Sequence, residues 1–209
     1  METNWAAEHL QVIRTLMERS ALYRRALAPI MMVNGAIGIA GAVVGCALSI
    51  KKNLAFSAYW MGISLLALIA SFLIARRQAL KEQEPFWSLP TRRVTQALLP
   101  SFLAGLVAGV VFMLVVPSSL SIGIGLLPPI WAILYGLALH SAGFFMERGI
   151  KLLGWLFVLS GLALLLDEIL FPDLQTSLMG HAVMGGFFGL LQLAYSIYLY
   201  STEKVNQAA

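Results

Sequence analysis

Long apolar runs without charge, separated by short polar segments, make up most of this 209-residue chain. The longest polar interruption extends from Arg76 to Arg93, with an arginine pair at each end and Lys81 between them. About 20 apolar residues are enough for a helix to cross the roughly 30 Å hydrocarbon core of a bilayer. The alternation of such runs with short polar segments therefore predicts an all-α, polytopic membrane protein.

We predict six transmembrane helices that form three helical hairpins within a bundle of residues 26–200. The uncharged stretch 94–146 is 53 residues long, too long for one span and suitable for two. The six expected spans are 26–50, 53–75, 95–116, 128–146, 149–166 and 177–200.

Pro128 and Pro129 decide where we start the fourth span. A proline has no backbone N–H, so a helix begun earlier would leave the carbonyls of Ile124 and Gly125 without their usual donors. Unpaired carbonyls are costly in lipid, whereas proline is well tolerated in the first helical turn. We therefore predict that the helix begins at Pro128 and that residues 119–127 form a loop or a short re-entrant segment.

The two ends of the chain are predicted to lie outside the bundle. Residues 1–25 place Trp5, Leu16 and their apolar neighbours on one helical face, with Glu8 and Arg19 on the opposite face. This pattern is typical of an amphipathic helix at the membrane surface, although the same face could dock on a partner protein. Residues 201–209 are predicted to form a short polar tail.

The distribution of lysine and arginine predicts the orientation. One side of the predicted membrane receives 12 of these residues, and the other receives only Lys51 and Lys52. Because basic residues accumulate on the cytoplasmic side, we expect both termini and residues 1–25 and 201–209 to be cytoplasmic. The overall pattern favours a bacterial inner (plasma) membrane protein.

Composition agrees with lipid as the solvent and excludes several functions. Only 11% of the residues are charged, against about 25% in soluble domains. The net charge of +4 comes from residues at the ends of apolar runs, so we predict contact with the lipid bilayer and no nucleic acid. Cys46 is the single cysteine, which excludes an internal disulfide or a cysteine zinc site.

Glycines recur at four-residue spacing on three predicted spans. Such spacing lets helix backbones approach closely, which favours association in lipid. These glycines serve either packing within the bundle or an interface with a membrane-protein partner or a second copy of the chain. The pairs are Gly41 and Gly45, Gly105 and Gly109, and Gly185 and Gly189.

Two groups of polar residues are candidate sites. Asn34, His140 and Gln192 are predicted to lie within spans, where they either bond across helices or line a substrate path. The other group, predicted at the outer face, could bind a cation, relay a proton, or form a solvated turn. Its members are Asp167, Glu168, Asp173 and His181.

The sequence contains no catalytic, nucleotide-binding or metal-binding motif of the usual kinds. His140 and His181 are predicted near opposite membrane faces, so this pair should not ligate one haem, and we predict no cofactor. We therefore favour a non-enzymatic subunit, scaffold or regulatory partner of a membrane assembly. Transport of a small molecule or ion is the alternative, and an intramembrane enzyme or cofactor-binding protein is a second alternative.

Overall fold

The computed structural model describes residues 27–208 apart from 82, 84–85, 117–121, 147 and 172–176. Within these residues the chain is all-α, and six helices are long and apolar enough to cross a membrane. The prediction of a multi-pass helical bundle is thus confirmed at this level. The predicted amphipathic helix of residues 1–25 lies outside the described part of the chain.

The last span is one continuous helix in three parts, because a π-helical segment, η2, joins two α-helical segments. In chain order, the elements are the first helix (Leu27–Ala47), α2 (Asn53–Lys81), α3 (Leu89–Leu114), α4 (Ile122–Ala142), α5 (Arg148–Leu170), α6 (Ser177–Gly185), η2 (Gly186–Leu191) and α7 (Gln192–Ala208).

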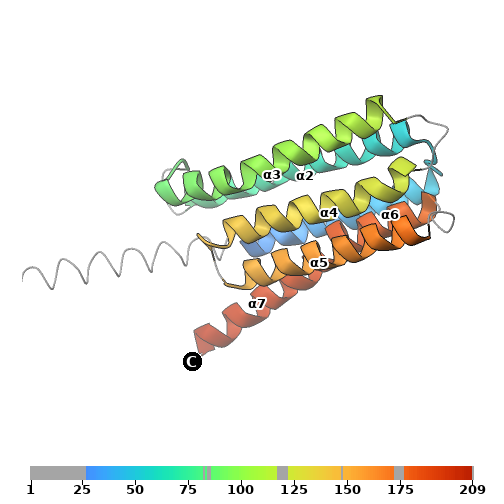
Figure 1. The fold of residues 1–209 in the computed structure, drawn as a ribbon. Coiled ribbons are helices and arrows are strands. Elements are labelled where there is room, and N and C mark those ends of the chain that lie inside the picture. The colour runs from blue at the N-terminus through green and yellow to red at the C-terminus, as the bar shows by residue number, and fades with distance from the viewer. Residues whose placement is uncertain are drawn as a thin grey trace, which may run out of the picture.

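The helices lie roughly side by side in three tiers (Figure 1). One outer tier holds α2 and α3, the middle tier holds the first helix and α4, and the other outer tier holds α5 and the α6–α7 helix. Successive helices run in opposite directions. We call the end where the first helix turns into α2 the Lys51 end, and the end where α2 turns into α3 the Arg76 end.

A left-handed residue ends the first helix at the Lys51 end. Ser49 has φ 48°, and the N–H groups of Ser49 and Ile50 donate to the carbonyls of Cys46 and Gly45. This pair of bonds is a Schellman motif, which satisfies carbonyls that the helix would otherwise leave open. The motif turns the chain sharply and leaves the carbonyl of Ile50 at the Lys51 end of the bundle.

Four helices extend beyond the apolar runs that predicted them. α3 begins at Leu89 instead of 95, and α7 continues from 200 to Ala208. α2 continues from the expected end at 75 to Lys81, and α5 continues from 166 to Leu170. Hydropathy marks where lipid contact ends, whereas a helix ends where its backbone turns. After α2 this occurs at Gln83, which has φ 53°.

The fourth span begins six residues earlier than we predicted. α4 starts at Ile122 and includes both Pro128 and Pro129. Ile124, Gly125, Leu127 and both prolines are buried in the protein. The prediction was wrong because it assumed that the freed carbonyls would face lipid; proline-broken backbone is tolerated in a membrane where protein covers it. Residues 122–127, predicted as a loop, are therefore helical.

The interior contains two apolar clusters. The cluster nearer the Arg76 end joins the first helix, α4, α5 and α7 through residues such as Met31, Leu139 and Phe157. The cluster nearer the Lys51 end joins α2, α4 and α6 through Phe56, Trp60, Ile124, Leu127 and Met184. The second cluster surrounds the polar groups described below.

The first helix and η2 approach each other more closely than side chains would allow. A Cβ on Gly38 would lie 2.8 Å from the backbone nitrogen of Gly189 and close to the carbonyl of Phe188. A Cβ on Gly189 would in turn lie 2.9 Å from the nitrogen of Ile39. Glycine at both positions therefore permits backbone-to-backbone contact between the middle tier and the last span.

Candidate functional site

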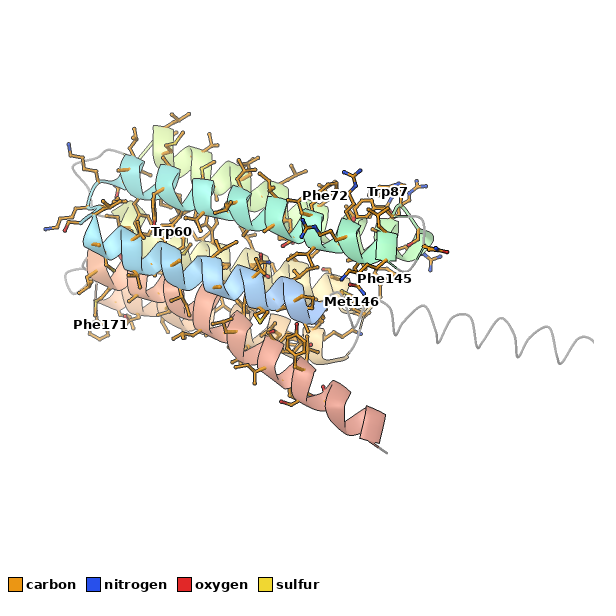
Figure 2. All side chains as sticks on the ribbon, turned by 180° about the vertical axis from the view of Figure 1, so that it is seen from behind. Trp60, Phe72, Trp87, Phe145, Met146 and Phe171 are labelled. Carbon is orange, nitrogen blue, oxygen red and sulfur yellow. The ribbon has the colours of Figure 1, made fainter. Side chains whose placement is uncertain are left out.

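The buried polar groups at the Lys51 end centre on His181, in the second turn of α6. Its side chain is only 1% exposed. Trp60 of α2 donates its indole N–H to Nδ1 of His181 at 3.1 Å, and Nε2 of His181 lies 3.3 Å from the carbonyl oxygen of Ile50. Figure 2 shows Trp60 in the half of the bundle nearer the Lys51 end.

These two contacts define the state of the imidazole. An indole N–H can only donate, so Nδ1 of His181 must accept and carries no proton. Nε2 then carries the single proton and donates it to the carbonyl of Ile50. His181 is thus a neutral ring with both nitrogens bonded, and it joins α6 to α2 and to the turn after the first helix.

Aromatic rings and a glycine complete the surroundings of His181. The rings of Phe56 and Tyr59 lie with centroids 5.0 and 6.0 Å from the imidazole. A Cβ on Gly45 would lie 2.5 Å from Nδ1, so the first helix passes directly over the ring. The hydroxyl of Tyr59 also donates to the carbonyl of Gly41 at 2.6 Å. This arrangement holds together the Lys51 ends of the first helix, α2 and α6. It leaves neither ring nitrogen of His181 free to bind a metal or a substrate.

Glu168 is the second buried ionisable group at this end. It lies two residues before the end of α5, and 7% of the residue is exposed. Its carboxyl group occupies the space beside Gly125 of α4, where a Cβ would lie 2.5 Å from Oε2. Oε2 has no hydrogen-bond partner within the described residues. A buried carboxyl oxygen without a partner among the described residues is costly in a membrane bundle, so Glu168 is a candidate functional group.

A small cavity lies between α4, α5 and α6, and Gly125, which faces the Glu168 carboxyl group, is part of its lining. Gly125, Pro128 and Pro129 of α4 line it together with Leu164 of α5 and Gly180 of α6. Its volume is about 10 Å³, close to the minimum that holds one water molecule. The cavity lies beside the part of α4 that the two prolines deprive of backbone donors.

The predicted acidic group at the outer face does not form one site in the described part of the chain. Asp167 is exposed, whereas its neighbour Glu168 is buried against α4. His181 bonds to Trp60 and to the carbonyl of Ile50 instead. Asp173 lies outside the described residues.

Each member of the predicted polar trio has different neighbours. Asn34 donates to Ser71 of α2 at 2.9 Å, and Gln192 donates to the hydroxyl of Tyr135 of α4 at 3.2 Å. The ring of His140 lies edge-on to Phe144 and Trp155, and its Nδ1 is buried without a hydrogen-bond partner in the described chain. No described contact joins Asn34, His140 and Gln192 to one another.

The glycines singled out from the sequence face neighbouring helices at differing distances. Their nearest neighbours across the helix contacts are Ile63 for Gly41, His181 for Gly45, Trp131 for both Gly105 and Gly109, Ala42 for Gly185 and Ile39 for Gly189.

Sequence reasoning missed four residues that these contacts depend on. Trp60, Ser71 and Tyr135 supply partners for His181, Asn34 and Gln192, and Gly125 makes room for Glu168. Trp60 and Tyr135 stand in apolar runs, and no local pattern pairs either of them with a residue on another helix. For Gly125 the sequence did contain one indication, because a glycine shortly before the Pro128–Pro129 pair marks a place where another group can approach the helix closely.

Comparisons do not extend these observations to a known protein. Within the described residues, no group of three or more His, Cys, Asp and Glu side chains is placed to hold a metal ion. No family model, no curated protein and no solved structure matches the chain.

Proposed function

We propose that the protein is a non-enzymatic subunit of a membrane assembly and that it binds a helix of another membrane protein on the outward face of α2. The observation that carries this proposal is Gly62. It is exposed on α2, and a Cβ built there would have nothing within 4 Å. A glycine weakens a helix, so one that faces outward is best explained by close approach of another backbone.

The burial of the outer tier supports the same proposal. The most apolar windows of α2 and α3 are each 6% buried, against 33–50% in the other spans. Ala58, one turn before Gly62, is also exposed, so two small residues lie together on the outward face of α2. Small residues four apart allow a partner helix to make the dense van der Waals contact that lipid chains do not provide.

The interior of the bundle also favours a subunit over an enzyme. Its polar groups tie helices together in pairs, as Asn34 does with Ser71 and Gln192 with Tyr135. We propose that the glycines which meet other helices, such as Gly41, Gly45 and Gly189, serve packing inside the bundle. This leaves the face around Gly62 for the partner.

Native mass spectrometry of protein extracted gently from its own membrane tests this function. We expect a stoichiometric second protein with the wild type, and its loss with Gly62→Leu, which fills the outward face. Leu159→Phe is the matched control, because Leu159 is 60% exposed on α5, on a different tier. This variant should retain the partner.

Three outcomes would contradict the proposal in different ways. A partner that survives in Gly62→Leu would exclude this face, and a wild-type chain that is always alone would exclude a subunit. A second copy of the same chain, lost only in Gly62→Leu, would make the face a homodimer interface.

We further propose an inner-membrane location with both termini in the cytoplasm, on the basis of the asymmetry of basic residues.

Transport of a small ion is the second candidate function, and Glu168 is the observation that favours it. A buried carboxyl beside carbonyls that two prolines leave without donors resembles, in physical terms, the open backbone groups from which transporters build ion sites. Uptake by the purified protein in vesicles, compared with a Glu168→Gln variant, distinguishes this function from a subunit role.

A further inference from the structure

We propose that Glu168 is a reversible proton-binding site, housed between α5 and the first turns of α4 at the Lys51 end. The site is independent of any partner on α2. Its occupant is a single proton. A cavity with room for about one water molecule is lined by Gly125, the residue that lies beside the carboxyl group.

The location of the carboxyl group is the first argument. Glu168 is more than nine-tenths buried, and its carboxyl group lies where a side chain at position 125 would be. The absence of a Cβ at Gly125 is therefore what admits the group to the interior. Oε2 has no hydrogen-bond partner in the described structure, so it is available to a proton or to water.

The first turns of α4 suit both charge states of this carboxyl group. α4 begins at Ile122, so the N–H groups of residues 122–124 have no partners in the helix, and its positive dipole end favours a carboxylate. Pro128 and Pro129 also deprive the carbonyls of Ile124 and Gly125 of their usual donors. An open carbonyl can accept the O–H of a protonated acid.

A reversible site requires that neither state is prohibitively costly. An ionised carboxylate in an apolar interior needs donors, and a protonated acid needs an acceptor. Residues 122–129 provide both kinds of group within two helical turns. An ordinary α-helix at this position would offer donors at its start but no open carbonyl until its other end.

Among the residues that the structure describes, the ionisable groups near the site leave Glu168 as the one that titrates inside it. Asp167 is adjacent on α5, but its side chain is exposed. His181 of α6 is held neutral between Trp60 and the carbonyl of Ile50. α4 contributes no ionisable residue between 122 and 134.

Infrared spectroscopy of the full-length protein in lipid nanodiscs tests this site. A protonated carboxylic acid has a carbonyl stretching band above the amide I band, and the carboxylate does not. We expect this band in the wild type, its loss as the pH is raised and its return on reacidification. It should be absent in Glu168→Gln, while Asp167→Asn, the matched control, should retain it with the same pH midpoint.

A second substitution tests the geometry. Gly125→Ala should move the band or its pH midpoint, because the added methyl group occupies the space of the carboxyl group. Should Glu168→Gln not fold, Glu168→Asp replaces it, and the shorter side chain should move the band or its midpoint. The proposal is overturned if wild type and the Glu168 variant have the same band at every pH. It is also overturned if Asp167→Asn removes the band or if the band never titrates.

Discussion

Trp60 and His181 are 121 residues apart in the sequence, and the indole N–H of Trp60 donates to Nδ1 of His181 at 3.1 Å. This bond closes the Lys51 end of the bundle, because it joins the start of α2 to the start of the last span. The ring nitrogen on the other side of His181 reaches the carbonyl of Ile50, where the first helix has just ended. Three helix ends therefore depend on one imidazole.

Replacing Trp60 with phenylalanine should destabilise the bundle. The change removes the donor to Nδ1 that the described residues supply and leaves a buried acceptor unpaired, which costs about 1–3 kcal/mol of unfolding free energy. Thermal unfolding in detergent, followed by circular dichroism, measures the loss. Trp155→Phe is the matched control, because Trp155 is 51% exposed, and this variant should unfold close to the wild type. Equal destabilisation by both substitutions would contradict the importance of the bond.

His181 and His140 should respond differently to replacement by phenylalanine. His181→Phe removes both an acceptor for Trp60 and a donor to Ile50, so it should lower the unfolding free energy by about 1–3 kcal/mol or more. His140→Phe keeps the edge-on contacts with Phe144 and Trp155 and removes Nδ1, which has no partner in the described residues. It should leave stability unchanged or slightly raised. Unfolding curves of the two variants in one detergent make the comparison, and a large loss for His140→Phe would indicate a bonded role for that ring.

Gly38→Ala should weaken the contact between the first helix and η2. The new methyl group would lie against the backbone of Phe188 and Gly189, which cannot rotate away as a side chain can. Overpacking of this kind costs about 1–3 kcal/mol. Gly62→Ala is the control, since its methyl group meets open space and alanine favours the helix. The unfolding temperature should fall for Gly38→Ala only; a fall of similar size in both variants would contradict the close approach.

Asn34 and Ser71 should show a small but measurable coupling. The Asn34 amide donates to Ser71 at 2.9 Å, and the Ser71 hydroxyl lies 3.1 Å from Oδ1 of Asn34. Hydrogen bonds between membrane helices average about 0.6 kcal/mol and reach about 1.7 kcal/mol. A double-mutant cycle with Asn34→Leu and Ser71→Ala should give a coupling energy in this range. Purely additive effects would mean that the two residues act independently.

The sequence correctly predicted the six spanning helices, because their length and apolar character are set by the need to cross lipid. A spanning helix must be long and apolar, so six spans could be read from runs of apolar residues without knowledge of their neighbours. The start of α4 was missed because the rule against proline concerns helices in contact with lipid. Whether Pro128 and Pro129 face lipid or protein depends on α5 and α6, which no local pattern encodes.

The candidate site was only partly predictable for the same reason. Glu168 and His181 could be selected as ionisable residues near helix ends, but their surroundings could not. The position of Glu168 near the end of an apolar run suggested a solvated turn, whereas Gly125 of another helix admits it to the interior. His181 was grouped with the acids by sequence position, although its partner Trp60 lies on α2.

The orientation of the bundle leads to a prediction about two single-cysteine variants. With Cys46 replaced by alanine, Lys52→Cys lies at the Lys51 end and Ser88→Cys at the Arg76 end, between α2 and α3. Because 12 of the 14 basic residues belong to the side of Ser88, that end should be cytoplasmic. In intact spheroplasts, a membrane-impermeant maleimide should label Lys52→Cys, and it should label Ser88→Cys only after the membrane is permeabilised. The reverse pattern would invert the orientation, and labelling of both positions in intact spheroplasts would contradict the placement of α2 across the membrane.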